Sequence, residues 1–389
     1  MPGTPLSHLR VVDLTDLRGA LAGRLLADLG ADVVKVEPPG GEARSPAFAY
    51  LNTSKRSVTL DLETEGGREL FRKLAARADA VFEALPREAL DRMGIGDRTL
   101  RAEHPRLVWV AISPFGRTGP RRDWKGSNLT GWAMAGVSIT VGDSDRAPLT
   151  PGGVVPLASN LTALNAAIGC LLALRARHAT GRGQLVDVSL HESAVAAGPE
   201  VGVPYFLEDL SLRRRSGNRR RFMPPSGLFP CRDGYASVVI LSIAHWRALA
   251  RWIHEKTGNE AVLDPLFESL AERCLVAELL EEWVEALTVE YAKQALFEEG
   301  QRRGVSITPV NKIADLANDP QLRARAYWTR VVDPHVGEVR IAGAPYRLSK
   351  TPWAARPAPR AGEHNEAIYC GELGISAAEL RAAREASVI

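Results

Sequence analysis

The sequence has few of the residues that build metal centres or disulfide frameworks. Only four cysteines occur in 389 residues, and they are scattered without the spacing of metal ligands. The eight histidines do not cluster either. We therefore expect no metal site and no tightly bound cofactor, and we expect the cysteines to be free thiols in a reducing cytoplasm.

A strong excess of charge and long apolar runs are also missing. Lysine and arginine total 49 against 46 aspartates and glutamates, and this near balance argues against a nucleic-acid partner. No run of 18 apolar residues is free of charge, and the opening MPGTPLSHLR has no apolar core, so we expect neither a membrane span nor a secretory signal. A hydrophobic content of 45% is ordinary for a soluble globular protein, for which we expect a cytoplasmic location.

Neither the GxGxxG nor the GxxxxGK[ST] motif is present, which excludes a standard dinucleotide fingerprint and a P-loop. What is present is an alternation of strand patterns with helix patterns. The strand patterns lie at 9–14, 33–36, 57–62, 80–83 and 107–112, and the helix patterns at 18–29, 65–78 and 87–93. This alternation predicts an α/β fold with a mostly parallel sheet. Because such sheets bind ligands outside the carboxyl ends of their strands, the loops after Leu14, Val36, Leu62, Phe82 and Ile112 are the predicted walls of a site.

A long apolar helix pattern begins at Ser159 and Asn160, whose side chains suit a helix N-cap. Apolar residues occupy nearly every face of this helix, which predicts that it is buried. Gly181 and Gly183 end it, and 185–190 alternates apolar and polar residues as a strand does. The capped N-terminus of a buried helix can present a reactive group, or it can be an ordinary helix end.

Changes in residue composition and in the strand and helix patterns along the chain predict a domain organisation. Residues 1–200 form the first part of a large Rossmann-like domain, 201–226 a linker, 227–325 a smaller α/β domain, and 326–389 a segment that returns to the large domain. Within the linker, 213–221 (RRRSGNRRR) could bind phosphates or an acidic partner. Such a run is more often a solvated loop.

Seven stretches, in order along nearly the whole chain, carry a family resemblance. They are LADLGADVVKVEPPGGEARS (26–45), NTSKRSVTLDLETEGGRELFRKLAARAD (52–79), ALDRMGIG (89–96), PRLVWVAISPFGRTGP (105–120), TGRGQLVDVSLHES (180–193), GVSITPVNKIADLANDPQ (304–321), and GAPYRLSKTP with GEHN (343–365). Together they resemble the class III CoA-transferases (the CaiB/BaiF family), which include formyl-CoA and carnitine-type CoA-transferases and α-methylacyl-CoA racemase. The resemblance implies an interlocked dimer with its site where two chains meet.

The chemistry implied by the resemblance is acyl transfer from a CoA thioester to a carboxylic acid through a catalytic aspartate. In this sequence the position of that aspartate falls on Ser159. The transferase Tyr-Glu pair, or the racemase His-Asp pair, falls on Ser127 and Asn128. Arg18 stands at the position of a glutamine and Ala84 at that of an asparagine, and the covering loop shortens to 216–227. Serine is a weak nucleophile without an adjacent base, so these departures put independent catalysis in doubt.

The same resemblance places CoA, as a substrate, along a few segments. Adenine and ribose would lie along Pro39 and along Leu60, Asp61, Leu62 and Glu63, with Leu85 close by and phosphate contacts near Arg92. Arg92 can offer two parallel charge-assisted hydrogen bonds, or it can be a solvated residue at a helix end. Glu63 replaces an expected lysine and would repel phosphate, so we expect weak CoA binding.

Three functions remain open from the sequence. The first is a CoA-transferase subunit that lacks the aspartate and works with a homologous aspartate-bearing subunit on an acyl-CoA and a carboxylic acid. Arg18 and the arginine run would suit a dicarboxylate. The second is a non-catalytic homodimer that binds CoA or acyl-CoA. The third is an acyl-CoA isomerase or lyase that uses other residues.

Overall fold

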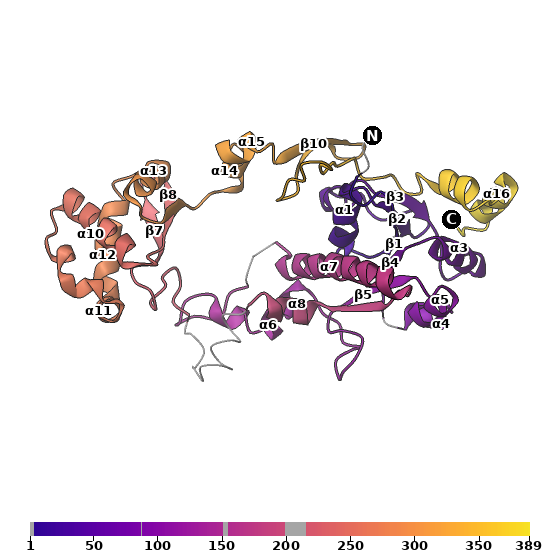
Figure 1. Ribbon diagram of the computed structural model, residues 1–389, viewed down its shortest axis with the longest axis horizontal. Coiled ribbons are helices and arrows are strands. Elements are labelled where there is room, and N and C mark those ends of the chain that lie inside the picture. Colours follow the sequence, from indigo (N-terminus) through magenta and orange to yellow (C-terminus); the bar gives the residue numbers. More distant parts are fainter. Residues whose placement is uncertain (1–3, 87, 151–154, 199–214) are drawn as a thin grey trace. The chain divides into compact units, whose positions relative to one another are not determined.

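The chain divides into two compact units. The computed structural model describes residues 4–86, 88–150, 155–198 and 215–389. Unit 1 takes in residues 1–137, 150–210 and 321–389, and unit 2 takes in 138–149 and 211–320. The chain therefore leaves unit 1 and returns to it, as the colours of Figure 1 show. Part of the predicted linker, 201–214, lies outside the described residues.

A six-stranded parallel sheet forms the centre of unit 1 (Figure 1). Its strands are β1 (Arg10–Leu14), β2 (Asp32–Glu37), β3 (Arg56–Thr59), β4 (Ala80–Glu83), β5 (Val108–Ser113) and β6 (Leu185–Ser189). Their order is β3-β2-β1-β4-β5-β6, and every neighbouring pair is parallel. The predicted parallel α/β fold is confirmed. The order reverses between β1 and β4, which is where doubly wound sheets bind their ligands.

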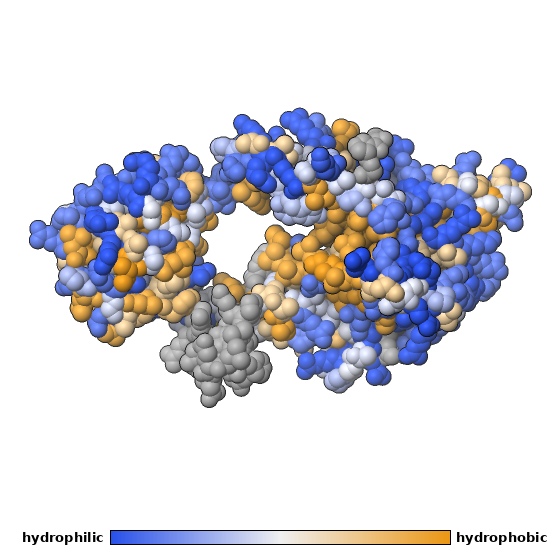
Figure 2. Space-filling model, viewed as in Figure 1, coloured by the Kyte–Doolittle hydropathy of each residue, from blue (hydrophilic) through white to orange (hydrophobic). Residues whose placement is uncertain are grey.

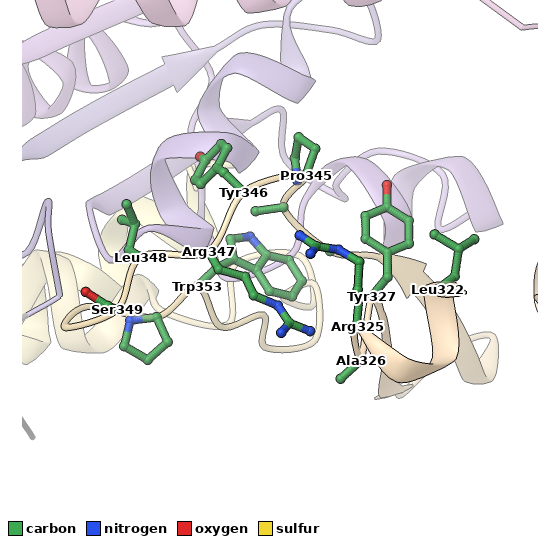
Figure 3. Close-up of a pocket in the computed structure, with 13 residues that line it drawn as sticks. Leu322, Arg325, Ala326, Tyr327, Pro345, Tyr346, Arg347, Leu348, Ser349 and Trp353 are labelled. Carbon is green, nitrogen blue, oxygen red and sulfur yellow. The ribbon is translucent and has the colours of Figure 1, made fainter. Parts of the chain in front are cut away.

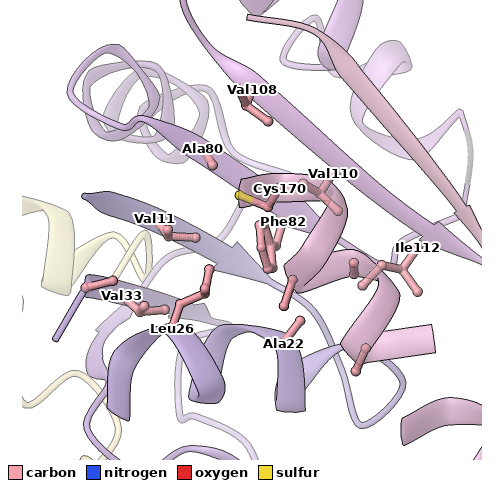
Figure 4. Packing of buried hydrophobic residues seen from close by; sticks show 14 of the residues in the cluster. Val11, Ala22, Leu26, Val33, Ala80, Phe82, Val108, Val110, Ile112 and Cys170 are labelled. Carbon is pink, nitrogen blue, oxygen red and sulfur yellow. The ribbon is translucent and has the colours of Figure 1, made fainter. Parts of the chain in front are cut away.

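Helices pack on both faces of this sheet. One face carries α1 (Ala20–Asp28) and α7 (Leu157–Thr180), whose small residues sit against Val11, Phe82 and Val110 (Figure 4). The other face carries α3 (Glu65–Ala76), α5 (Asp97–Glu103) and the C-terminal α16 (Ala377–Glu385). Because both faces are covered, the strands are almost continuously buried, including the polar residues of β2 and β3. The remaining elements of unit 1 are α2 (Pro46–Leu51), α4 (Ala89–Arg92), α6 (Asn128–Met134), α8 (Leu190–Ala196), β10 (Trp328–Asp333) and β11 (Gly337–Ala342).

Unit 2 is a small α/β unit with its own core. Its antiparallel sheet is ordered β7-β8-β9, formed by Gly227–Cys231, Gly234–Val238 and Ile307–Pro309. The helices are α10 (Ile243–Thr257), α11 (Leu270–Leu275), α12 (Ala277–Thr288), α13 (Lys293–Arg303) and α14 (Ile313–Ala317), with α15 (Pro320–Ala324) at the boundary. Phe229, Trp246 and Trp252 are buried between sheet and helices.

The sequence interpretation of α7 was wrong in two respects. The helix begins at Leu157 with Pro156 as N-cap, so Ser159 and Asn160 lie inside its first turn rather than capping it. It is also not buried all round, because Leu164, Ile168 and Leu172 are 42%, 54% and 64% exposed. Figure 2 shows an apolar surface where α7 lies in Figure 1. By length and composition α7 could cross a membrane, but half of that stretch is buried against the unit, as in the core helix of a soluble protein.

Candidate active site

A cavity of about 690 Å³ opens in unit 1 at the carboxyl ends of β4 and β5. Its walls come from the loops after β1, β4 and β5 and from the segment that leads into α6. The lining consists of Arg18, residues 83–86, 88, 92, 111–114, 116 and 117, and residues 122–126. Of the predicted site residues, the structure brings Arg18, Leu85 and Arg92 together here. The loops after β1, β4 and β5 were among the predicted walls, whereas those after β2 and β3 do not line the cavity.

Arg18 ties two of these loops together. Its Nη2 donates to the carbonyl oxygen of Ala84 at 2.6 Å, and its Nε donates to Asp16. Arg18 and Ala84 are the two positions at which the resemblance implies glutamine and asparagine. The side chain is one-third exposed and faces the cavity, where a guanidinium can recognise a carboxylate.

A buried network of charged and polar groups fixes the start of the loop that carries Arg18. Lys55 Nζ donates to Asp13 Oδ2 (2.8 Å), to Asn52 Oδ1 and to the carbonyl oxygen of Ala20. Asp13 Oδ1 accepts hydrogen bonds from both the backbone and the hydroxyl of Thr15. Burial raises the pKa of Asp13, but the charges of Lys55 and Lys35 together with the hydrogen bonds from Lys55 and Thr15 outweigh this effect, and the net pKa is lowered. The network fixes the end of β1, from which the loop of Arg18 begins.

Asn128 and Ser159, predicted on separate grounds, lie against each other. The Oδ1 of Asn128 accepts the backbone N–H groups of Ala158 (2.8 Å) and Ser159 (3.3 Å). Ser127 is the N-cap of α6, with a capping box to Thr130. Ser127 and Asn128 follow directly on the cavity wall at Gly126, and Ser159 is buried in the first turn of α7. The Asn128 amide oxygen alone links the start of α6 to the start of α7, and neither serine nor asparagine is an acid or base at neutral pH.

The remaining residues predicted for CoA lie outside this cavity. Glu63 and Arg92 line a second, shallower cavity of about 490 Å³, so Arg92 faces both. The Leu60 side chain is buried in the core, and its N–H donates to the carbonyl oxygen of Glu37. Asp61 donates its N–H to the carbonyl oxygen of Val388, which fixes the segment of Leu62 and Glu63. Pro39 is half-buried.

Sequence reasoning missed Glu83 and Arg117. Glu83 ends β4 and lines the cavity, and its Oε1 lies 3.4 Å from Arg117 Nη1. Burial raises the pKa of Glu83 to about 7, against the opposing effects of Arg117 and of the Leu85 N–H group. A charged residue at the end of an otherwise apolar strand is the signal that could have found it. A carboxyl group with this pKa, in a cavity beside the sheet reversal, is a functional-site candidate.

A further cavity, of about 710 Å³, lies elsewhere in unit 1. Figure 3 shows Tyr327, Trp353 and Arg347 among its lining. Its segment is bound to the C-terminal half of α1, because Ala354 N–H donates to the carbonyl oxygen of Asp28. That end of α1 lies at the amino edge of the sheet, since the helix runs back from the carboxyl end of β1. We therefore place the candidate site in the cavity at β4 and β5.

The arginine run of 213–221 is largely engaged within unit 2. Arg213 and Arg214 lie outside the described residues. Arg215 donates to backbone carbonyl oxygens of Ile139, Asp143 and Arg146. The side chains of Arg219 and Arg221 form ion pairs with glutamates of α12. In the part of the chain that the structure describes, no group of three His, Cys, Asp or Glu side chains could hold a metal ion.

Comparison with known proteins identifies the family. A sequence model of CoA-transferase family III matches residues 6–365. The chain is 32% identical to the succinyl-CoA–D-citramalate CoA-transferase of Chloroflexus aurantiacus over 97% of this chain and 96% of that protein. It is 34% identical to the succinyl-CoA:(R)-benzylsuccinate CoA-transferase subunit BbsE of Thauera aromatica, with the same coverage. A CAIB/BAIF family protein from Brucella suis has a similar structure, with a TM-score of 0.82 and 31% identity over 95% of this chain and 99% of that one. The chain therefore belongs to CoA-transferase family III.

Proposed function

We propose that this chain is one subunit of a CoA-transferase, and that a homologous subunit supplies the catalytic aspartate. The observation that carries the proposal is the contact of Asn128 with Ser159. At the helix end where the resemblance expects a nucleophilic carboxylate, this chain has a serine, and the Asn128 amide oxygen accepts the backbone N–H of that serine. The similarity to BbsE, whose name calls it a subunit, supports the same interpretation.

The exposed face of α7 supports a partner chain of the same family. Leu164, Ile168 and Leu172 are spaced by four residues and therefore form one stripe along the helix. Large exposed apolar surfaces on soluble proteins commonly mark interaction sites. A homologous partner would cover this stripe in an interlocked dimer, and would bring its own site residues to the assembly.

The substrates we propose are an acyl-CoA thioester and a carboxylic acid. Succinyl-CoA is the donor to test first, because it appears in the names of both relatives. Arg18, Arg92 and Lys125 line the cavity and suit carboxylate or phosphate groups. A dicarboxylic acid acceptor fits these cations best.

Co-expression tests the proposal. The chain carries an affinity tag and is produced with a homologous chain from the same genome that has aspartate at the position of Ser159. We expect a complex of the two, identified by mass spectrometry, that moves CoA from succinyl-CoA to a dicarboxylic acid, and no transfer by this chain alone. Transfer at the same rate by the isolated chain would refute the subunit role.

A CoA-binding homodimer without catalysis is the second candidate. Arg92 and Lys125 favour it, because neither side chain makes a hydrogen bond or ion pair with a described residue, so both side chains can receive an anion. A stable homodimer that binds CoA, and that recruits no homologous chain in the co-expression experiment, would select this function over the first.

A further inference from the structure

One buried arginine beside the cavity lies within ion-pair distance of three carboxylates. Arg117 lies 3.4 Å from Glu83, 3.1 Å from Asp97 and 3.8 Å from Asp91, measured between the nearest nitrogen and oxygen atoms. The side chains of Arg117, Glu83 and Asp97 are 11%, 7% and 6% exposed. Asp97 also lies 3.7 Å from Arg101, and Asp91 is 34% exposed. If all three carboxylates were ionised, the two arginines would leave one negative charge uncompensated beside the buried Glu83.

Of the three carboxyl groups, that of Glu83 is the one placed to take up a proton. Its carboxyl lines the cavity, one oxygen accepts the Leu85 N–H at 2.9 Å, and the other faces Arg117 at a distance that is long for an ionic hydrogen bond. Burial raises its pKa to about 7, and the nearby Asp97 charge adds to that effect. Asp97, in contrast, has the shorter contact with Arg117.

The cavity also has exposed cations that attract anions. Arg92 and Lys125 are exposed there, and neither is neutralised by a described residue. An oxyanion drawn in by these cations enters the same cavity that Glu83 lines. Its negative charge favours the protonated form of a neighbouring carboxyl. The other charged groups around the cavity are Arg18, Glu88, Arg122 and Asp123, and Asp187 accepts the backbone N–H of Arg117 from β6.

Building on the proposed function, we propose that Glu83 is the proton-exchanging group of this cavity, so that an oxyanion enters together with a proton. The proton comes from solvent and forms an O–H bond on the Glu83 carboxyl, and it returns to solvent when the ligand leaves. The ligand chemistry is a phosphate of CoA or the carboxylate of the acid. Proton uptake offsets the added negative charge, and the affinity for oxyanions is therefore greater at lower pH.

Calorimetry measures the proton directly. CoA and succinate are titrated separately into the wild-type chain at pH 7, in PIPES, HEPES and Tris, whose ionisation enthalpies differ. If the bound oxyanion strengthens proton binding at Glu83 about tenfold, uptake is roughly 0.4 proton per ligand bound. Glu83→Gln removes this uptake, while the phosphate ionisation of CoA itself is common to both proteins. The matched control is Glu88→Gln, an exposed glutamate on the same cavity wall, which keeps the uptake.

The two ligands distinguish the source of the oxyanion, since uptake with CoA alone assigns a phosphate and uptake with succinate alone assigns a carboxylate. Equal proton uptake by wild type and Glu83→Gln overturns the inference, and so does failure of both ligands to bind. The proposed function is judged separately by the co-expression experiment.

A second measurement needs no variant of Glu83. Wild-type affinity for the ligand that binds is followed from pH 6 to pH 9, where a tenfold coupling makes binding roughly eightfold weaker at the upper end. Succinate is fully ionised over most of this range, so the change then belongs to the protein. A succinate affinity that does not change with pH overturns the inference even if Glu83→Gln fails to fold.

Discussion

The amide oxygen of Asn128 lies 3.3 Å from the backbone nitrogen of Ser159 and 2.8 Å from that of Ala158. A residue in the first turn of α6 therefore satisfies two free N–H groups at the start of α7. The contact spans about thirty residues of chain and joins two of the predicted site residues.

This contact predicts that Asn128→Ala destabilises the fold. Removing the acceptor leaves two N–H groups at the end of α7 unpaired, so the free energy of unfolding should fall by about 1–2 kcal/mol. Asn128→Asp keeps the acceptor and should retain most of the stability. Urea unfolding followed by circular dichroism measures the change. Asn160→Ala is the control, because Asn160 is not the helix cap that its sequence position indicated. An equal loss in the control would contradict the assignment.

The apolar stripe on α7 predicts a defect in assembly. Ile168→Asp places a charge in the middle of the stripe and should prevent association with the homologous subunit, while the unassembled chain still folds. Burying an unpaired carboxylate in an interface costs several kcal/mol, enough to weaken the complex more than a hundredfold. Analytical ultracentrifugation of the co-purified subunits tests this. Ile313→Asp is the matched control, since Ile313 is 87% exposed in unit 2 and belongs to a different helix. Normal assembly of the Ile168 variant would remove α7 from the interface.

We predict that CoA binds more weakly when the Arg92 side chain is removed. It lines both cavities at the carboxyl edge and has no described partner to lose, so Arg92→Ala should change affinity without changing the fold. Loss of one charge-assisted contact to phosphate should weaken binding about tenfold. Calorimetric titration with CoA provides the measurement. Arg98→Ala, an exposed arginine that lines neither cavity, should bind CoA as the wild type does. Equal affinities of wild type and Arg92→Ala would take Arg92 out of the site.

Ser159→Asp should not restore covalent chemistry. Asn128, which contacts residue 159, and its neighbour Ser127 supply neither an acid nor a base, and a new carboxylate needs such surroundings to react. The new aspartate would also be buried, which destabilises its charged form. The positive end of the α7 dipole offsets only part of this cost. The variant is incubated with acyl-CoAs and hydroxylamine and analysed by mass spectrometry beside Ser159→Ala. A hydroxamate or CoA adduct at residue 159 would show a competent site and would refute the proposal that this chain depends on a homologous subunit for catalysis.

The fold of unit 1 could be predicted from strand and helix periodicity. Most of its strands are short, largely apolar runs, and its helices have recognisable residues at their ends. Thr64 caps α3 by accepting the N–H of Gly67, and Gly181 ends α7 with a positive φ, as predicted for that glycine. The site was harder, since its contacts join residues distant in sequence. Nothing local to Ser159 reveals that Asn128 caps its helix, and nothing local to Glu83 reveals Arg117 from the loop after the neighbouring strand. The exposure of α7 was missed because an apolar face covered by a partner has the same pattern as one buried in a core.

Glu83 predicts a distinctive dependence of stability on pH. Its pKa rises from an ordinary value of 4.5 to about 7 in the folded chain. Between these two values the folded state holds a proton on Glu83 that the unfolded state has lost, so stability falls as the pH rises. The loss attributable to Glu83 between pH 4.5 and pH 7.5 should approach about 3 kcal/mol. Glu83→Gln cannot ionise and lacks this contribution, so its unfolding free energy should decline less steeply across that range. The measurement is urea unfolding at half-unit steps of pH, with Glu88→Gln expected to follow the wild type. Parallel profiles for wild type and Glu83→Gln would show that Glu83 ionises normally in its buried position.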